Sequence, residues 1–277
     1  MLIRCWGARG SIPVSGQEYV RYGGDTPCIE IRTSDDDIVI IDGGSGVRRL
    51  GNRLVAEDRH DYTMIFTHAH WDHIMGFPFF KPIYLPETRI GLFGCPFAQA
   101  SVKEMISRIM APPNFPVRFE EITAEISYQE TCQDTFTLGC LSVTPIAISH
   151  PNQGMGYRFE EGGKSLVFLT DNELTYRHPG GMAYEDYCSF AKGADLLIHD
   201  AEYRPEDYLL TRTWGHSVYT DAVQLALDSG VGRLGLFHHN QERTDQALDE
   251  MVEESRRIAA GRPLQCFAMS QDMEIAL

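Results

Sequence analysis

The segment Phe66–Ile74 reads FTHAHWDHI and places three histidines and one aspartate within six positions. It follows the apolar run Tyr62–Ile65, which predicts a buried strand that ends just before the histidines. Imidazole nitrogens and carboxylate oxygens are the ligands that zinc, iron and manganese prefer. His68 and His70 are two positions apart and can face one ion, while Asp72 and His73 can face a second point. The segment therefore favours two ions that share one cluster over a chance group of polar surface residues.

Further histidines and aspartates also come at the ends of short apolar runs. They are His150 after LSVTPIAIS, Asp171 after KSLVFLT, His199 and Asp200 after ADLLI, and His238 and His239 after RLGLF. Helical patterns cover about 97–110, 184–192, 217–229 and 244–259, and Ser217 is expected to cap the third. Strands that alternate with helices predict a layered α/β protein with its chemistry at a sheet edge. Taken alone, His150, His216 and His238 would each be interpreted as a structural histidine before a metal ligand.

The bulk composition is that of an ordinary globular protein. The chain has 277 residues and 43% hydrophobic content, so we expect a single domain over residues 1–277. The start, MLIRCWGARG, has no apolar signal-peptide region and no run is long enough to span a bilayer, which favours a cytoplasmic protein without membrane contact. Seven scattered cysteines with no C-x-x-C pair predict small buried core residues rather than a disulfide framework or a cysteine zinc site.

The charge balance bears on the partner. A formal net charge of −15 is opposite to that of most proteins that grip long nucleic acid, and it favours a small substrate or one held by metal. Arg9, Lys81, Arg118 and Arg158 are available to meet phosphate oxygens, although each residue type is more often a solvated surface charge.

The segment THAHWDH resembles the H-x-H-x-D-H signature of the metallo-β-lactamase superfamily, and Asp42 in IIDGGSG resembles that family's structural aspartate. The resemblance implies a four-layer αββα sandwich. It also implies one ion held by His68, His70 and His150, a second held by Asp72, His73 and His238, and Asp171 as the bridging ligand. Zinc is the first expectation, and the same ligands suit manganese or iron. Whether His238 or His239 is the ligand stays open, and the spacing from Leu236 favours His238.

Within the superfamily, ADLLIHDAEY, the tripeptide GHS and the L-x-L-x-H run ending at His238 resemble the tRNase Z-like phosphodiesterase branch. That resemblance implies an Asp200–His216 pair in which His216 protonates the leaving oxygen, with Asp72 orienting the nucleophile. The alternative is a purely structural hydrogen bond between the two side chains. The family commonly has glutamate where this chain has Asp200, so the shorter side chain is a departure from the pattern.

These observations predict hydrolysis of a small phosphodiester, such as a cyclic nucleotide or a cyclic phosphate. The main alternative is a tRNA 3′-processing endoribonuclease, but residues 151–170 read as one hairpin around Gly162 and Gly163 where that enzyme inserts its tRNA-gripping arm. The sequence is also compatible with a hydrolase of carboxylic esters, lactones or thioesters and with a non-catalytic metal-dependent sensor. True β-lactamases usually carry arginine at the position of His73 and cysteine at that of Asp171, which disfavours that activity. The resemblance also suggests a homodimer.

Overall fold

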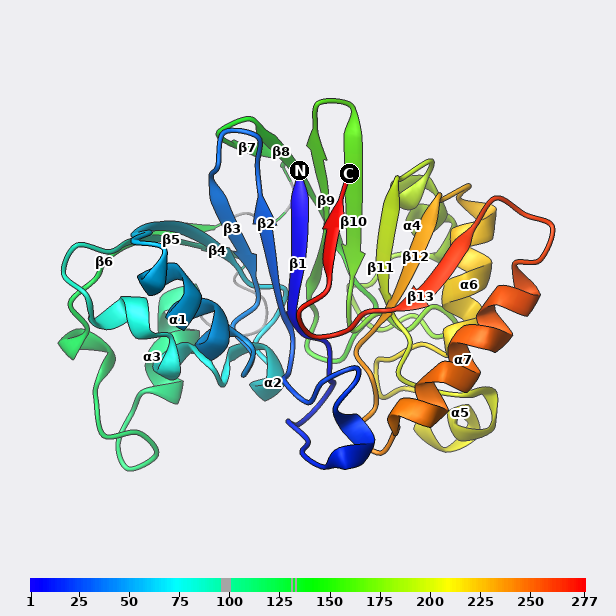
Figure 1. Ribbon diagram of the computed structural model, residues 1–277, viewed down its shortest axis with the longest axis horizontal. Helices are drawn as coiled ribbons and strands as arrows, with labels where there is room; N and C mark the ends of the chain where they lie inside the picture. The colour runs from blue at the N-terminus through cyan, green and yellow to red at the C-terminus, as the bar shows by residue number, and fades with distance from the viewer. Residues whose placement is uncertain (96–100, 131, 133) are drawn as a thin grey trace.

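The computed structural model describes residues 1–95, 101–130, 132 and 134–277, which form two seven-stranded sheets (Figure 1). The first sheet has the order β14-β1-β2-β3-β4-β5-β6, with bounds β1 Leu2–Gly7, β2 Cys28–Arg32, β3 Ile38–Ile41, β4 Asp61–Ile65, β5 Arg89–Gly94, β6 Glu125–Glu130 and β14 Glu274–Ala276. The second has the order β13-β12-β11-β10-β9-β8-β7, with bounds β7 Phe136–Leu138, β8 Leu141–Ala147, β9 Met155–Glu161, β10 Lys164–Leu169, β11 Leu196–Asp200, β12 Arg233–Phe237 and β13 Gln265–Ala268.

Helices cover the outer face of each sheet (Figure 1). Helices α1 (Val47–Ala56) and α3 (Val102–Ile109) flank the first sheet, and α4 (Tyr184–Ala191), α6 (Tyr219–Asp228) and α7 (Asp245–Ile258) flank the second. Three buried apolar clusters fill the spaces between the helices and the first sheet, between the two sheets, and between the second sheet and its helices. This arrangement confirms the expected αββα sandwich.

The apolar run of β3 shows why the sequence folds in layers. All four of its residues are buried, with Ile38 and Ile40 in the cluster on the helix side and Val39 and Ile41 in the cluster between the sheets. Successive side chains of a strand point to opposite faces, so a strand covered on both sides must be apolar throughout. Strand β10 has the same division, since Leu166 and Phe168 face the other sheet.

The strand directions bring the carboxyl ends of the central strands to one end of the sandwich. Strands β3 to β6 are mutually parallel, as are β10 to β13, and β8 runs with β10 because both are antiparallel to β9. The short helices α2 (Trp71–Ile74) and α5 (Pro205–Thr211) lie at this end with the loop that follows β1 (Figure 1). In the residues that the structure describes, no helix has the length and apolar character needed to span a membrane.

The helix predictions are largely confirmed. Helices α4, α6 and α7 lie within the expected ranges, and α3 confirms the part of 97–110 from Val102 on, while 96–100 lie outside the described residues. The proposed cap of α6 is wrong, because the cap position is Val218. The hydroxyl of Ser217 instead donates to the carbonyl of Asn172 at 2.6 Å.

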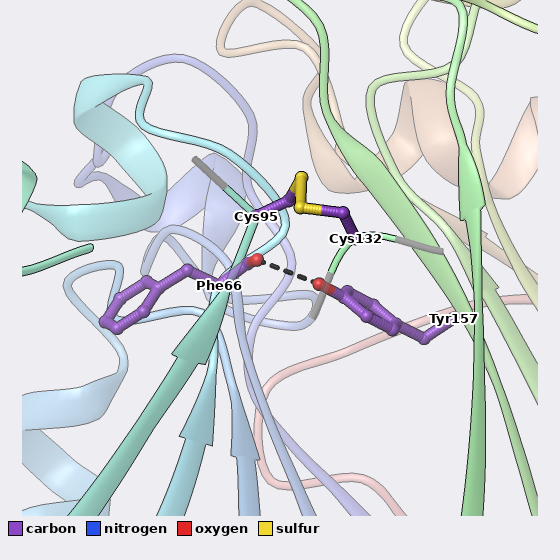
Figure 2. Close-up of a disulfide and its surroundings, with 4 residues drawn as sticks. All are labelled: Phe66, Cys95, Cys132 and Tyr157. Atoms are coloured by element: carbon purple, nitrogen blue, oxygen red, sulfur yellow. Dashed lines mark hydrogen bonds between the residues drawn. A yellow bond between two sulfur atoms is a disulfide. The ribbon is translucent and has the colours of Figure 1, made fainter. Parts of the chain in front are cut away.

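The expectation that every cysteine is a small core residue is wrong for Cys95 and Cys132, which form a disulfide (Figure 2). Cys95 directly follows β5 and Cys132 comes two residues after β6, and these two strands pair in parallel. Their Cα atoms are therefore only 4.7 Å apart although 37 positions separate them in the chain. Cys5, Cys28 and Cys266 are buried as expected, whereas Cys140 is exposed.

A buried tyrosine joins the two sheets at the first residue of the histidine segment Phe66–Ile74. The hydroxyl of Tyr157, on β9, donates to the carbonyl oxygen of Phe66 at 3.2 Å (Figure 2). Tyr157 is fully buried in the cluster between the sheets, so its hydroxyl needs a protein partner there. This bond fixes the end of β4 against the second sheet, from which half of the candidate site comes.

At the opposite end of the sandwich, Glu161 is expected to make stability depend on acid. Burial raises the pKa of Glu161, but hydrogen bonds from Cys140, from the N–H of Ser34 and from the N-terminal ammonium outweigh it and lower the pKa to about 2. A carboxylate whose pKa is lower in the folded state contributes stability that is present above its ordinary pKa of 4.5 and is lost toward about 2. Urea unfolding at pH 7 and pH 3 should therefore show that Glu161→Gln destabilises the chain less at pH 3. An equal loss at both pH values would contradict this assignment.

Candidate metal centre

The histidine segment begins where β4 ends and turns directly into α2. His70 occupies the cap position of α2, which contains Asp72 and His73. Thr67 anchors the start of the segment, because its N–H and its hydroxyl donate to the two carboxylate oxygens of Asp42, both at 2.8 Å. The buried carboxylate of Asp42, which follows the neighbouring strand β3, thus holds the start of the segment in place.

Asp42 also orients His73. Its Oδ2 accepts from the Nδ1–H of His73 at 2.7 Å, so the Nε2 of that ring points away from Asp42. Asp42, Asp171 and His238 all have positive φ angles, of 61°, 52° and 57°. Left-handed backbone is rare for residues other than glycine and clusters at functional sites, where it aims a side chain. Each of the three comes at or just after the end of a buried strand.

The first cluster gathers His68, His70, His150 and Asp171, each of which offers one ligand atom within 4.8 Å of the others. The Nδ1–H of His150 donates to the carbonyl of Gly215 at 2.8 Å, which leaves its Nε2 3.0 Å from the Nδ1 of His70. Burial lowers the pKa of His68 well below its usual range and that of His150 to about 3. These imidazoles are therefore neutral, the form in which histidine binds a metal.

The second cluster gathers Asp72, His73, Asp171 and His238, again within 4.8 Å, so Asp171 belongs to both clusters. Burial opposes a charge on His73, but Asp171, Asp72 and Asp42 outweigh it and raise the pKa of His73 well above its usual range. His238 behaves in the same way, since burial lowers its pKa and Asp171 with Asp72 and Glu202 more than compensates. This half of the site has a surplus of buried carboxylate charge that a cation would neutralise.

The donor set fits a pair of divalent ions. Among the described residues, the Nε2 atoms of His68 and His73 are buried and have no hydrogen-bond partner. Buried polar atoms without a partner are rare, and those here lie inside a ring of nitrogen and carboxylate ligands. The two clusters with one shared carboxylate are suited to a dinuclear metal site, and the nitrogen–oxygen donor set is one that zinc, manganese and iron all accept.

The predicted Asp200–His216 pair is present beside these clusters. The Nδ1–H of His216 donates to Oδ2 of Asp200 at 2.6 Å, and the His216 ring stacks on His238 with centroids 4.6 Å apart. Burial lowers the pKa of His216, but the carboxylates of Glu202 and Asp200 outweigh it and raise the pKa to about 9. A histidine that is protonated at neutral pH next to a candidate metal pair can donate a proton to a departing oxygen.

Glu202 is a buried acid that the sequence analysis did not identify. Its Oε2 accepts from Nδ1–H of His238 at 2.8 Å and lies 3.4 Å from Nδ1 of His216, and its Oε1 accepts from Asn240. A carboxylate that holds the outer nitrogen of a ligand histidine fixes the ring and its tautomer. The only signal in the sequence is its place two positions after Asp200.

His238 and His239, of which the sequence left open which one is the ligand, take different positions. His239 is buried with its Nε2–H donating to the carbonyl of Met269 at 2.7 Å, and it belongs to neither cluster. His199 donates to the carbonyl of Asp200 and packs beside Asn172. His238 is therefore the member of the pair that faces the site.

Two of the arginines that the sequence made available for phosphate contact, Arg9 and Arg158, bind backbone carbonyls instead. Arg9 is fully buried and donates to the carbonyls of Asn240, Arg243 and Gly23, so it ties the loop after β1 to the chain beyond β12. Arg158 donates to the carbonyl of Phe190 on α4, on the helix side of the second sheet.

Comparisons with known proteins agree with this fold. A family model described as "Beta-lactamase superfamily domain" matches residues 38–239. Ribonuclease Z of Oceanobacillus iheyensis is 23% identical over an alignment that covers 71% of this chain and 77% of the relative. Among solved structures, the metallo-β-lactamase fold protein YhfI from Bacillus subtilis superposes with a TM-score of 0.73 and 16% identity, covering 99% of this chain and 98% of the other. A diphosphatase from the PhnP family superposes with a TM-score of 0.70 and 18% identity, covering 100% and 97%.

Proposed function

The chain belongs to the metallo-β-lactamase superfamily and is a metal-dependent hydrolase, and we propose that it is a dinuclear phosphodiesterase acting on a small phosphodiester such as a cyclic nucleotide or cyclic phosphate. The observation that carries this proposal is the Asp200–His216 pair, 2.6 Å apart, beside two ligand clusters that share Asp171. A phosphodiester with an alkoxide leaving group needs both charge stabilisation and a proton donor. The site offers residues for both.

The proposed ligands are those that the two clusters contain. One ion would be held by His68, His70 and His150 and the other by Asp72, His73 and His238, and Asp171 belongs to both groups of ligands. Zinc is the first candidate, and manganese and iron suit the same donors. When bound, such a pair supplies a nucleophilic water of low pKa and stabilises charge on the phosphoryl oxygens.

The side chains have separate tasks in the proposed reaction. Asp72 is held by the N–H of Ser11 at 2.9 Å, so its carboxylate is fixed to orient the nucleophile. His216 gives its proton to the leaving oxygen and is then reprotonated from water at the site, since 9% of its surface is exposed. Asp200 keeps the ring of His216 oriented, and the negative charge of Asp200 and Glu202 keeps it protonated before the step.

A tRNA 3′-processing activity is the second candidate, and the similarity to Ribonuclease Z over 71% of the chain favours it. Against it stand the net charge of −15 and the segment between His150 and Asp171. Strands β9 and β10 occupy that segment as one hairpin that turns at Gly162 and Gly163, both with positive φ. The hairpin lies within the second sheet and adds no arm to hold an RNA.

The proposal is tested with the purified chain, zinc or manganese, and four substrates: two phosphodiesters, a carboxylic ester and a 3′-extended tRNA. We expect bis(p-nitrophenyl) phosphate and a 2′,3′-cyclic nucleotide to be cleaved, and a p-nitrophenyl carboxylic ester to be cleaved poorly. Asp72→Ala should abolish the activity, whereas Asp58→Ala, at a surface aspartate that is 97% exposed, should retain it. Turnover of the carboxylic ester alone would favour an ester, lactone or thioester hydrolase, and efficient trimming of a 3′-extended tRNA would favour the second candidate. Metal binding without any turnover would favour a sensor.

A further inference from the structure

Glu173 is a buried carboxylate near the site with no role in the proposed reaction. Its side chain is completely buried and accepts four hydrogen bonds. Oε1 accepts from the hydroxyl of Tyr208 at 2.6 Å and from the N–H of Thr213 at 2.8 Å. Oε2 accepts from Nε2–H of His178 at 2.8 Å and from the N–H of Gly215 at 2.9 Å. One carboxylate thus joins the segment after Asp171, helix α5 and the loop 213–215.

The loop 213–215 passes this constraint directly to His150. Gly215 gives its N–H to Glu173 and accepts the Nδ1–H of His150 with its carbonyl at 2.8 Å. Gly215 has a φ of 94°, and a Cβ at this position would lie 2.1 Å from Nδ1 of His150. The backbone of Gly215 is therefore packed against the imidazole, and only glycine allows that approach. A shift of this loop must move or turn His150.

The same loop continues into His216. The next residues are held by Asp200, whose two oxygens accept from Nδ1–H of His216 and from the N–H of Ser217. The stretch 213–217 is consequently fixed at its start by Glu173 and at its end by Asp200. Trp214 lies between Thr213 and Gly215, whose N–H groups both donate to Glu173. Trp214 itself is 61% exposed, so Glu173 holds the loop through its backbone.

We propose that Glu173 is a positioning residue that holds the loop 213–215 where it fixes the orientation and tautomer of His150 and the place of His216. Glu173 has no exposed surface and lies behind the loop, so it acts through Gly215 and not on the substrate. An oriented outer nitrogen is what makes a histidine an effective metal ligand. The inference uses the proposed metal site, and the activity part of its test uses the proposed function.

Glu173→Gln tests the proposal with little change in shape. Each oxygen of Glu173 accepts from two donors, so either placement of the amide puts its NH₂ group against two of them. We expect zinc affinity to fall about tenfold or more. We expect kcat on a cyclic nucleotide to fall about ten- to a hundredfold with KM changed less than about threefold. In the metal-free full chain, the Nδ1–H signal of His150 in ¹⁵N-histidine spectra should shift or broaden.

Glu161→Gln is the matched control, because Glu161 is also a buried carboxylate with several donors but lies at the other end of the sandwich. If Glu173→Gln lowers only the melting temperature, as Glu161→Gln should, and leaves zinc affinity and the His150 signal within about twofold of wild type, the proposal is overturned. If Glu173→Gln does not fold, Tyr208→Phe decides, since it removes one donor only: a two- to threefold loss of zinc affinity supports the proposal and no loss overturns it. A wild-type chain without phosphodiester turnover would overturn the proposed function. The zinc affinity and the spectra would still test the positioning role of Glu173.

Discussion

An Asp171→Asn chain is expected to lose tight binding of divalent metal and at least about a thousandfold of phosphodiester turnover. Asp171 is the one residue that belongs to both ligand clusters, with its oxygens 3.1 Å from Nε2 of His73 and 3.3 Å from Nε2 of His238. Loss of a partner that merely orients a ligand costs about ten- to a hundredfold in metal affinity, so loss of a ligand shared by two ions should cost more. The amide keeps the shape of the side chain but supplies one neutral acceptor in place of a charged carboxylate.

Isothermal titration with zinc and the melting temperature with and without zinc measure this loss. A metal that binds only the folded chain raises stability in proportion to the logarithm of its concentration over the dissociation constant, so wild type should melt higher in zinc and Asp171→Asn should not. Asp195→Asn is the control, because Asp195 accepts from Lys164 and Ser165 at the opposite end of the same sheet. A variant at Asp171 that binds two zinc ions with wild-type affinity would refute the bridging assignment.

The sequence predicted the parts of the site that are local in the chain. His68, His70, Asp72 and His73 lie within six positions, so a single turn after one strand suffices to bring them together. His150 and Asp171 follow strands β8 and β10 of the other sheet, and no spacing in the chain shows that they meet the histidine segment. Their assignment rested on resemblance to a family, and the structure brings their ligand atoms within 4.8 Å of those of His68.

What the sequence could not predict depends on contacts between distant segments. Glu202 and Glu173 are acids in ordinary contexts, and only the packing of β11, β12 and loop 213–215 reveals that their carboxylates hold histidine or backbone N–H groups. The Cys95–Cys132 disulfide likewise follows from the parallel pairing of β5 and β6, which neither segment encodes by itself. Arg9 shows the opposite difference. Its charge favoured an exposed position, but its side chain is buried and donates to three backbone carbonyls.

The second large effect is expected from His216→Ala, and its size should depend on the leaving group. General acid catalysis by a placed side chain contributes about 10² to 10⁴ in rate when the departing oxygen is a poor leaving group. Ring opening of a 2′,3′-cyclic nucleotide expels a ribose oxygen as an alkoxide, so His216→Ala should lower kcat on this substrate by that factor. The p-nitrophenolate of bis(p-nitrophenyl) phosphate departs without a proton, so the loss there should stay below about tenfold.

Paired measurements of kcat on the two substrates, with metal content determined on each preparation, separate proton donation from metal binding. His216 lies in a group with Asp171, Asp200 and His238. If His216 were a metal ligand, His216→Ala would lower the metal content and slow the turnover of both substrates alike. Asp200→Asn should show the same dependence on the leaving group in weaker form, because Asp200 orients the ring through the 2.6 Å hydrogen bond. His60→Ala, at a histidine whose Nε2 lies 3.1 Å from the exposed Asp58, should show neither effect. Equal losses on both substrates with full metal occupancy would mean that the Asp200–His216 pair is structural, and that the chemistry at this site belongs to the two ligand clusters alone.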